Sequence, residues 1–151
     1  MRLRIPPLLL TVIFAAMMLA MSSLLPRFSI TLPARSVIAS CFAAVGVAVC
    51  AAGLVSFRNA RTTINPARPD QTSALVVNGI YRISRNPMYL GFLILLVAWG
   101  VFLQHVLAIL LAPALFVAYL DRFQIKPEEQ ALSRLFGEYF ASYKSDVRRW
   151  L

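Results

Sequence analysis

The stretch "NGIYRISRNPMYLGFLILLVAWG", residues 78–100, changes from polar to apolar at a single point. Arg85 and Asn86 end its polar half, and no Asp, Glu, Lys or Arg occurs between Pro87 and Asp121. Asparagine is a favoured helix N-cap, and proline suits the first position of a helix. The stretch therefore predicts an apolar helix that begins at Pro87, directly beside cationic side chains.

Two other segments, residues 8–25 and 36–57, also carry no charged residue. About 20 apolar residues cross the hydrocarbon core of a bilayer, and residues 88–120 are long enough for two crossings if the chain turns near 103–105. The hydrophobic content of 60% exceeds that of soluble domains. We predict an all-α integral membrane protein, a single domain over residues 1–151, with about four transmembrane helices, at about residues 8–25, 36–57, 87–102 and 106–123.

The net charge of +9 is distributed by membrane side. Of the 15 Lys and Arg residues, two lie in residues 26–35, and the other 13 lie before residue 8, within 58–87 or after 120. This asymmetry predicts a multi-pass protein with both termini in the cytoplasm. It argues against nucleic acid and favours anionic lipid headgroups as partners of the basic residues. Residues 1–25 are not expected to be a signal peptide, because their apolar run is long for one and no clear cleavage site follows it.

The cysteines and the histidine give no metal-ligand pattern, so no metal is predicted. Cys41 and Cys50 are nine residues apart in one predicted helix and would point to opposite sides, so they should not pair. His105, the only histidine, is expected as a solvated side chain in the turn between two helices. Small residues that recur every three or four positions predict a close helix contact; they are Ala39, Ala43, Gly46, Cys50 and Gly53.

Beyond Pro127, apolar residues recur at helical spacing through Trp150. The opposite face of this predicted helix is charged. The pattern indicates a C-terminal amphipathic helix on the cytoplasmic side, which would be either a membrane-surface helix or a lid over a site. Its apolar residues are Leu132, Leu135, Phe136, Tyr139, Phe140, Tyr143, Val147 and Trp150, and its polar ones are Glu129, Arg134, Glu138, Lys144 and Arg148.

Two groups of opposite charge would meet on that side. The positive end of the helix that begins at Pro87, reinforced by Arg82 and Arg85, suits a carboxylate or a phosphate. Glu128 and Glu129, in the first turn of the amphipathic helix, suit an ammonium group or hydroxyls. Together they suit a zwitterionic ligand. The alternative is that the arginines anchor the helix in the headgroups and the glutamates only complement a helix dipole.

With these residues in view, the chain resembles the isoprenylcysteine carboxyl methyltransferase and phospholipid methyltransferase superfamily of integral membrane proteins. The resemblance covers roughly residues 58–150, and each of its pieces is weak without the others. Its carriers are "LVVNGIYRISRNPMYLG" at 75–91, "EE" at 128–129, "FG" at 136–137, Tyr143 and "VRRW" at 147–150. The family uses S-adenosylmethionine, a zwitterionic amino acid, as its cofactor.

The resemblance implies cofactor-site elements at residues 73–91 and 122–150. Arg122, near the acceptor side, and Arg85 are the candidate catalytic residues. Two departures matter: Asn86 stands where the family often has histidine, so proton transfer there is doubtful, and Phe140 replaces a frequent tyrosine. The candidate cofactor-binding residues are Ser73, Ala74, Leu75, Val76, Tyr81, Asn86, Pro87, Met88, Tyr89, Glu128 and Glu129.

These observations predict a membrane-embedded methyltransferase that depends on S-adenosylmethionine and has a cytoplasmic active site. Its partners would be membrane lipids and a lipophilic or lipid-modified acceptor, such as an isoprenylcysteine carboxylate or a lipid amine. One alternative is a sterol-reductase-like enzyme that uses NADPH, although no dinucleotide fingerprint occurs in the sequence. Another is a non-enzymatic membrane scaffold.

Overall fold

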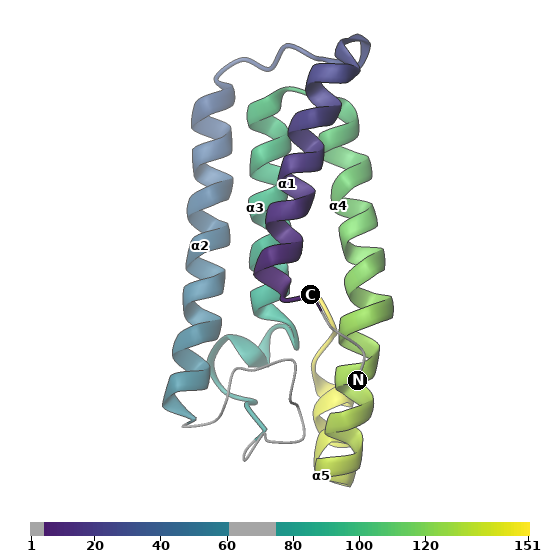
Figure 1. The fold of residues 1–151 in the computed structure, drawn as a ribbon. Coiled ribbons are helices and arrows are strands. Elements are labelled where there is room, and N and C mark those ends of the chain that lie inside the picture. Colours follow the sequence, from purple (N-terminus) through teal and green to yellow (C-terminus); the bar gives the residue numbers. More distant parts are fainter. Residues whose placement is uncertain (1–4, 61–74) are drawn as a thin grey trace.

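The computed structural model of the chain describes residues 5–60 and 75–151, so Ser73 and Ala74 lie outside the described residues. Four helices run side by side, and a fifth lies at one end of them (Figure 1). The described residues contain no strand, which confirms the predicted all-α fold. The helices are α1 (Pro7–Leu24), α2 (Arg35–Asn59), α3 (Pro87–Leu103), α4 (Val106–Leu120) and α5 (Lys126–Asp146).

Three stretches are long and apolar enough to cross a membrane: α1, α2, and the continuous helical run Val106–Asp146 that starts with α4. The outward faces of these helices carry exposed leucine, isoleucine and valine side chains, as a lipid-facing surface requires. The chain is therefore a multi-pass membrane protein. The predicted count of four is not reached by length alone, because α3 has 17 residues, about 25 Å of helix against a core of about 30 Å.

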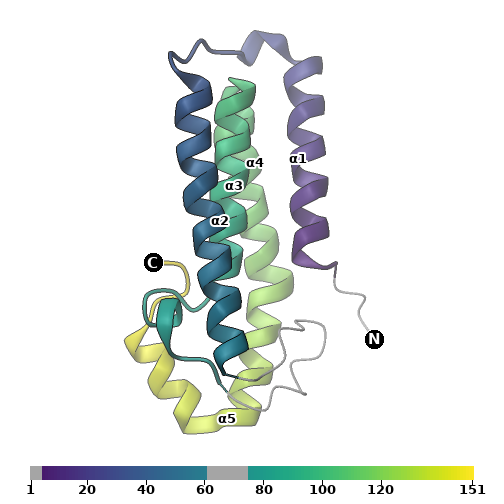
Figure 2. The same cartoon turned by 90° about the vertical axis from the view of Figure 1, so that its left-hand side faces the viewer.

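The core lies between α1, α3 and α4. Figure 2 shows α3 and α4 between α2 and α1. Phe14 of α1 and Phe116 of α4 meet edge to face with ring centroids 5.3 Å apart. Met18 and Leu96 are fully buried beside them. The Trp99 indole N–H donates to the Ala15 carbonyl at 3.1 Å, so α3 is fixed to α1 by a polar contact as well as by packing.

Helix α2 packs on α3 through the predicted small residues. Its buried residues are Ala39, Gly46 and Gly53, which recur at intervals of seven on one face. A Cβ on Gly46 would lie 2.9 Å from Cγ of Leu95, and one on Gly91 would lie 2.8 Å from the Gly46 carbonyl oxygen. The two backbones can approach this closely only because side chains are absent at these points.

The prediction for His105 was wrong. The residue is fully buried at the N-cap of α4, and its Nδ1 accepts the Ala108 amide at 3.4 Å. Its Nε2 lies 3.0 Å from the Leu25 carbonyl oxygen and is therefore the protonated nitrogen. A histidine in this position satisfies backbone groups of two helix ends at once, so burial has no cost in unpaired polar atoms.

The same end of the molecule ties the loop between α1 and α2 to the turn between α3 and α4. Ile30 donates its amide to the Gln104 carbonyl at 2.8 Å, and Arg35 donates to the Gln104 side-chain oxygen at 2.9 Å. Gln104 has a φ of 53°, a left-handed conformation that lets the chain reverse directly between α3 and α4. The opposite end is thereby left to α5 and the N-terminus of α3.

Between α4 and α5 the chain makes one π-helical turn, η4 (Asp121–Ile125). The extra residue in this turn directs Gln124 and Ile125 inward, where Gln124 donates to the Ile5 carbonyl at 2.7 Å. Asp121 and Arg122 lie at its start. Such turns inside longer helices often accompany functional sites.

Helix α5 differs from the predicted single amphipathic helix. It bends at Gly137, whose φ of 49° and ψ of −125° are not helical. Its second half folds back and buries Phe140 and Tyr143, while Leu135 and Tyr139 of the predicted apolar face stay exposed. Glu129, expected on the polar outer face, points inward with its side chain 14% exposed. The 3.6-residue helical periodicity does not continue through Gly137, because its non-helical backbone changes the direction in which the following side chains point.

Candidate active site

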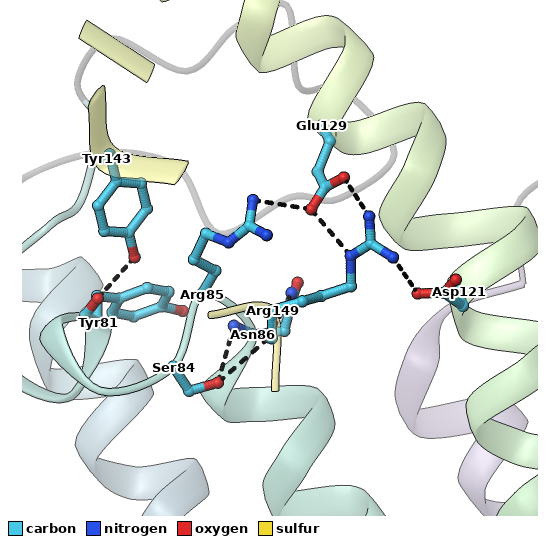
Figure 3. A network of polar contacts seen from close by, with 8 residues as sticks. All are labelled: Tyr81, Ser84, Arg85, Asn86, Asp121, Glu129, Tyr143 and Arg149. Carbon is cyan, nitrogen blue, oxygen red and sulfur yellow. Dashed lines mark hydrogen bonds and ion pairs between the residues drawn. The ribbon is translucent and has the colours of Figure 1, made fainter. Parts of the chain in front are cut away.

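The candidate site lies at the end of the bundle where α3 begins and α5 lies (Figure 1). Three chain segments meet there: the turn before α3, the start of α5, and residues 147–151 after α5. Figure 3 shows their polar side chains converging. The sequence predicted the first two segments as neighbours, and the third completes them.

Helix α3 begins at Pro87, as predicted, with Asn86 at the N-cap. The Asn86 side chain does not cap the helix, which corrects that part of the prediction. Its Nδ2 donates instead to the Arg149 carbonyl at 3.0 Å, and its amide N–H donates to the Ser84 hydroxyl at 3.2 Å. Asn86 thus joins the α3 terminus to the end of the chain.

Five charged residues form a continuous network beside this terminus; the most exposed of them is Lys126, whose Nζ lies 3.7 Å from Oδ2 of Asp121. Arg149 holds Glu129 with two hydrogen bonds, from Nε to Oε1 at 3.1 Å and from Nη2 to Oε2 at 2.7 Å. Its Nη1 donates to Asp121 at 2.8 Å. The hydrogen bonding that Arg149 donates to the Glu129 carboxylate raises the pKa of Arg149 above its already high value, so this guanidinium stays charged.

Arg85 is the fifth member, and its side chain is only 12% exposed. Its Nη1 lies 3.0 Å from Oε1 of Glu129, which is ion-pair distance. Nη1 contacts Glu129 as an ion pair without a well-directed hydrogen bond, and the buried Nε has no acceptor among the described residues. Arg149, in contrast, donates to both oxygens of Glu129. Arg85 therefore keeps buried donor capacity that an anion could use.

Glu128 faces the other way, toward α3. Its Oε2 accepts the Tyr89 hydroxyl at 3.1 Å. Burial raises the pKa of the Tyr81 hydroxyl far above its usual value, and the Glu128 carboxylate raises it further. Tyr81 is thus a neutral phenol close to an anionic carboxylate. The site combines a buried cation, Arg85, with a partly buried anion, Glu128.

An apolar wall closes the site beneath these charges. Tyr143 donates its hydroxyl to the Tyr81 carbonyl at 2.6 Å, and the Tyr81 ring meets Phe57 of α2 edge to face at 5.4 Å. Val76 is buried, and Leu75 packs against the cluster formed by the second half of α5. The buried members of that cluster are Phe140, Tyr143 and Val147.

The remaining predicted residues lie near the network to different degrees. Pro87 is fully buried, and Met88 packs over Gly53 of α2. Arg122 has an exposed side chain on η4, beside the exposed Phe123. Glu129 also borders a cavity of about 400 Å³, whose other lining residues are Lys126, Gln130, Ser133, Arg134 and Lys144.

Sequence reasoning missed Arg149 and Asp121 as members of the site. Arg149 was part of the "VRRW" pattern, but nothing in the pattern separates it from Arg148, whose side chain is exposed. The signal that separates them is the end of α5 at Asp146. Val147, the next residue, has an extended backbone, and the side chain of Arg149, two positions further on, reaches Glu129.

Comparisons with known proteins show the family of the chain. Residues 34–139, more than half of the chain, match the family model described as phospholipid methyltransferase. An uncharacterized protein from Haemophilus influenzae (strain ATCC 51907 / DSM 11121 / KW20 / Rd) is 42% identical over 64 residues, which are 42% of this chain and the whole of that protein.

A protein-S-isoprenylcysteine O-methyltransferase A from Arabidopsis thaliana is 29% identical over 106 residues. The match covers 68% of this chain and 52% of the Arabidopsis protein, so the chain spans about half of that relative. The matched family region includes α2, α3, α4 and the start of α5, and therefore Arg85, Tyr89 and both glutamates of the site. This chain belongs to the phospholipid methyltransferase family.

Proposed function

We propose that the protein is a membrane-embedded methyltransferase that uses S-adenosylmethionine to methylate a lipophilic acceptor. Family membership supports methyl transfer, and the charge arrangement of the site supports this donor. The acceptor would be an isoprenylcysteine-like carboxylate or a lipid amine. The Arabidopsis relative, whose name states an isoprenylcysteine substrate, supports the first of these.

The observation that carries the proposal is that one site contains a buried cation, Arg85, and the carboxylate of Glu128. The buried Nε of Arg85 has no acceptor in the described part of the chain, and its Nη1 contacts Glu129 only as an ion pair at 3.0 Å. Glu128 accepts a hydrogen bond from Tyr89, which lies four residues after Arg85 in the sequence. An amino acid carries its carboxylate and its ammonium on one carbon atom, and a ligand of this kind could meet both charges. The donor is such a zwitterion, so the residues present fit it.

Each residue would then have a binding role. Arg85 would hold the carboxylate of the amino-acid part, and Glu128 the ammonium or the ribose hydroxyls. Leu75, Val76 and Tyr81, with the apolar cluster behind them, would keep water from the donor. When bound, the donor supplies an electrophilic methyl group, and these residues contribute position and desolvation. Asn86, Pro87, Met88 and Tyr89 would form the wall at the α3 terminus.

The acceptor would enter from the lipid side. Arg122 and Phe123 are both exposed on η4, where a polar headgroup and an apolar chain could be held next to each other. A guanidinium pairs bidentately with a carboxylate, so Arg122 would orient an anionic acceptor. We place this site, and both ends of the sequence, on the cytoplasmic side because of the excess of Lys and Arg there.

Calorimetry on the purified protein in detergent micelles tests the donor. We expect adenosylhomocysteine, the product form of the donor, to bind with one-to-one stoichiometry and NADPH to give no heat. Binding of NADPH alone would favour a reductase, and heat from neither ligand would favour a scaffold. Incubation of native membranes with a donor carrying an isotopically labelled methyl group, followed by lipid extraction, would then identify the acceptor class.

A further inference from the structure

Residues 147–151 cross from the end of α5 to the start of α3 and are held there by backbone contacts. The Arg85 amide donates to the Arg148 carbonyl at 3.1 Å. The Arg149 carbonyl accepts from Asn86 Nδ2 at 3.0 Å and from the Ser84 hydroxyl at 3.5 Å. The backbone of Arg149 is therefore fixed relative to Arg85, which lies in the same turn as Ser84 and Asn86.

The Arg149 side chain engages both carboxylates of the network. Each of its three guanidinium nitrogens donates a hydrogen bond, two to Glu129 and one to Asp121. Arg85, in contrast, approaches Glu129 at ion-pair distance without a hydrogen bond aimed at it. The two arginines thus share one carboxylate, and Arg149 has the better geometry (Figure 3).

This division decides what Arg85 can bind. If Arg149 were absent, the two oxygens of Glu129 would be open to the guanidinium of Arg85, and a planar fork on a carboxylate is the geometry that arginine favours. The N–H groups of Arg85 would then donate to Glu129 and would not be available to a ligand. With Arg149 present, Nη1 of Arg85 is limited to the ion pair with Glu129, and the buried Nε has no acceptor among the described residues.

We propose that Arg149 is a positioning residue that occupies Glu129 and so keeps Arg85 open to the carboxylate of a bound ligand. The identity of that ligand rests on the proposed function above, but the competition for Glu129 does not. Asp121 supports the arrangement because it fixes the third nitrogen of Arg149. Glu129 thereby acts through the two arginines and does not contact the ligand.

The first arm of the test needs no ligand. In micelles, the Nε–H signal of Arg85 can be followed by nitrogen-15 NMR, with Arg85→Lys to assign it. In Arg149→Gln we expect this proton to exchange with water at least fivefold more slowly than in the unaltered protein, because Glu129 now accepts it. Arg148→Gln is the matched control. It also removes one positive charge, but from the neighbouring residue, whose side chain is exposed.

The second arm measures adenosylhomocysteine binding by calorimetry. Arg149→Gln should bind roughly tenfold to a hundredfold more weakly, the effect of one lost charge-assisted hydrogen bond. The double variant Glu129→Gln, Arg149→Gln should recover at least fivefold of that loss, because Arg85 is released again. If residues 147–151 only stabilised the fold, the double variant would not recover any affinity for adenosylhomocysteine.

The outcomes separate the two proposals. Unchanged exchange of the Arg85 proton in Arg149→Gln overturns the positioning role, whatever the ligand. A double variant that binds no better than Arg149→Gln also overturns it, since Glu129 would then contact the ligand or support the fold directly. Altered exchange in a protein that binds no adenosylhomocysteine keeps the competition and rejects the proposed donor.

Discussion

At the scale of single residues, Glu128 carries the sharpest expectation. Its carboxylate accepts the Tyr89 hydroxyl and lies close enough to Tyr81 to raise the pKa of that phenol. Glu128→Gln keeps the size and the polar contact but removes the charge. A charge-assisted hydrogen bond contributes about 1.5–3 kcal/mol, so adenosylhomocysteine should bind roughly tenfold to a hundredfold more weakly. Glu138→Gln, at an exposed position of α5, is the control; equal loss in both would contradict a binding role.

Arg122 gives a second test at this scale, because its side chain is exposed and can be changed without disturbing the core. Arg122→Lys keeps the charge and can still reach the headgroups, but it lacks the planar fork. If Arg122 orients the acceptor, methyl transfer should fall about tenfold or more while adenosylhomocysteine affinity holds. Turnover in mixed micelles and calorimetry measure the two separately. Equal turnover in both proteins would leave Arg122 as an interfacial anchor.

Local residue patterns predicted the start of α3 and the nearness of its arginine to the two glutamates. Helix caps and acidic first turns are set by neighbouring residues, so one sequence suffices for them. The partner of Glu129 could not be predicted in this way. Arg149 is 20 residues away and reaches Glu129 only because α5 bends at Gly137 and ends at Asp146.

At the scale of elements, the contact between α2 and α3 depends on glycine at Gly91. A Cβ there would meet Sγ of Cys50 and lie 2.8 Å from the Gly46 carbonyl oxygen. Gly91→Ala should destabilise the fold by about 1–2 kcal/mol, since overpacking costs about 1–3 kcal/mol and the better helix propensity of alanine offsets up to about 1 kcal/mol. The apparent midpoint of thermal unfolding, followed by circular dichroism in micelles, should drop by several degrees.

The control for this contact is Ala48→Leu, which adds a larger side chain to the exposed face of α2. It should leave the midpoint within about one degree, because its added atoms meet only lipid or detergent. A Gly91→Ala protein as stable as the unaltered one would mean that α2 can move away from α3 at no cost. The small-residue spacing in the sequence predicted this packing because the pattern and the contact share the same helical period.

At the scale of the whole molecule, charge and apolar length predicted the helices within a few residues of their observed bounds. The bundle order did not follow from them. Helix α3 packs against α1 and α2 as well as α4, although all four helices are apolar around most of their surface. Lipid and protein offer similar surroundings to an apolar side chain, so hydropathy cannot show which face is inside. The burial of His105 could not be predicted from local sequence either, since one of its two partners, Leu25 at the end of α1, lies 80 residues away.

The orientation of the whole bundle in the membrane can be tested from its two ends. Arg27 and Arg35 lie at the end with the turn between α3 and α4, and the site with α5 lies at the other. By sequence, 13 of the 15 Lys and Arg residues fall within 1–7, 58–87 and 121–151. The described parts of these segments lie at the α5 end, so that end should face the cytoplasm. In a Cys41→Ala, Cys50→Ala background, a membrane-impermeant maleimide added to intact cells should label Thr31→Cys and leave Ser145→Cys unlabelled until the cells are lysed. Both positions are exposed in the structure, so burial cannot explain a missing label. Labelling of Ser145→Cys alone would reverse the orientation and place the site outside the cell, away from a cytoplasmic methyl donor.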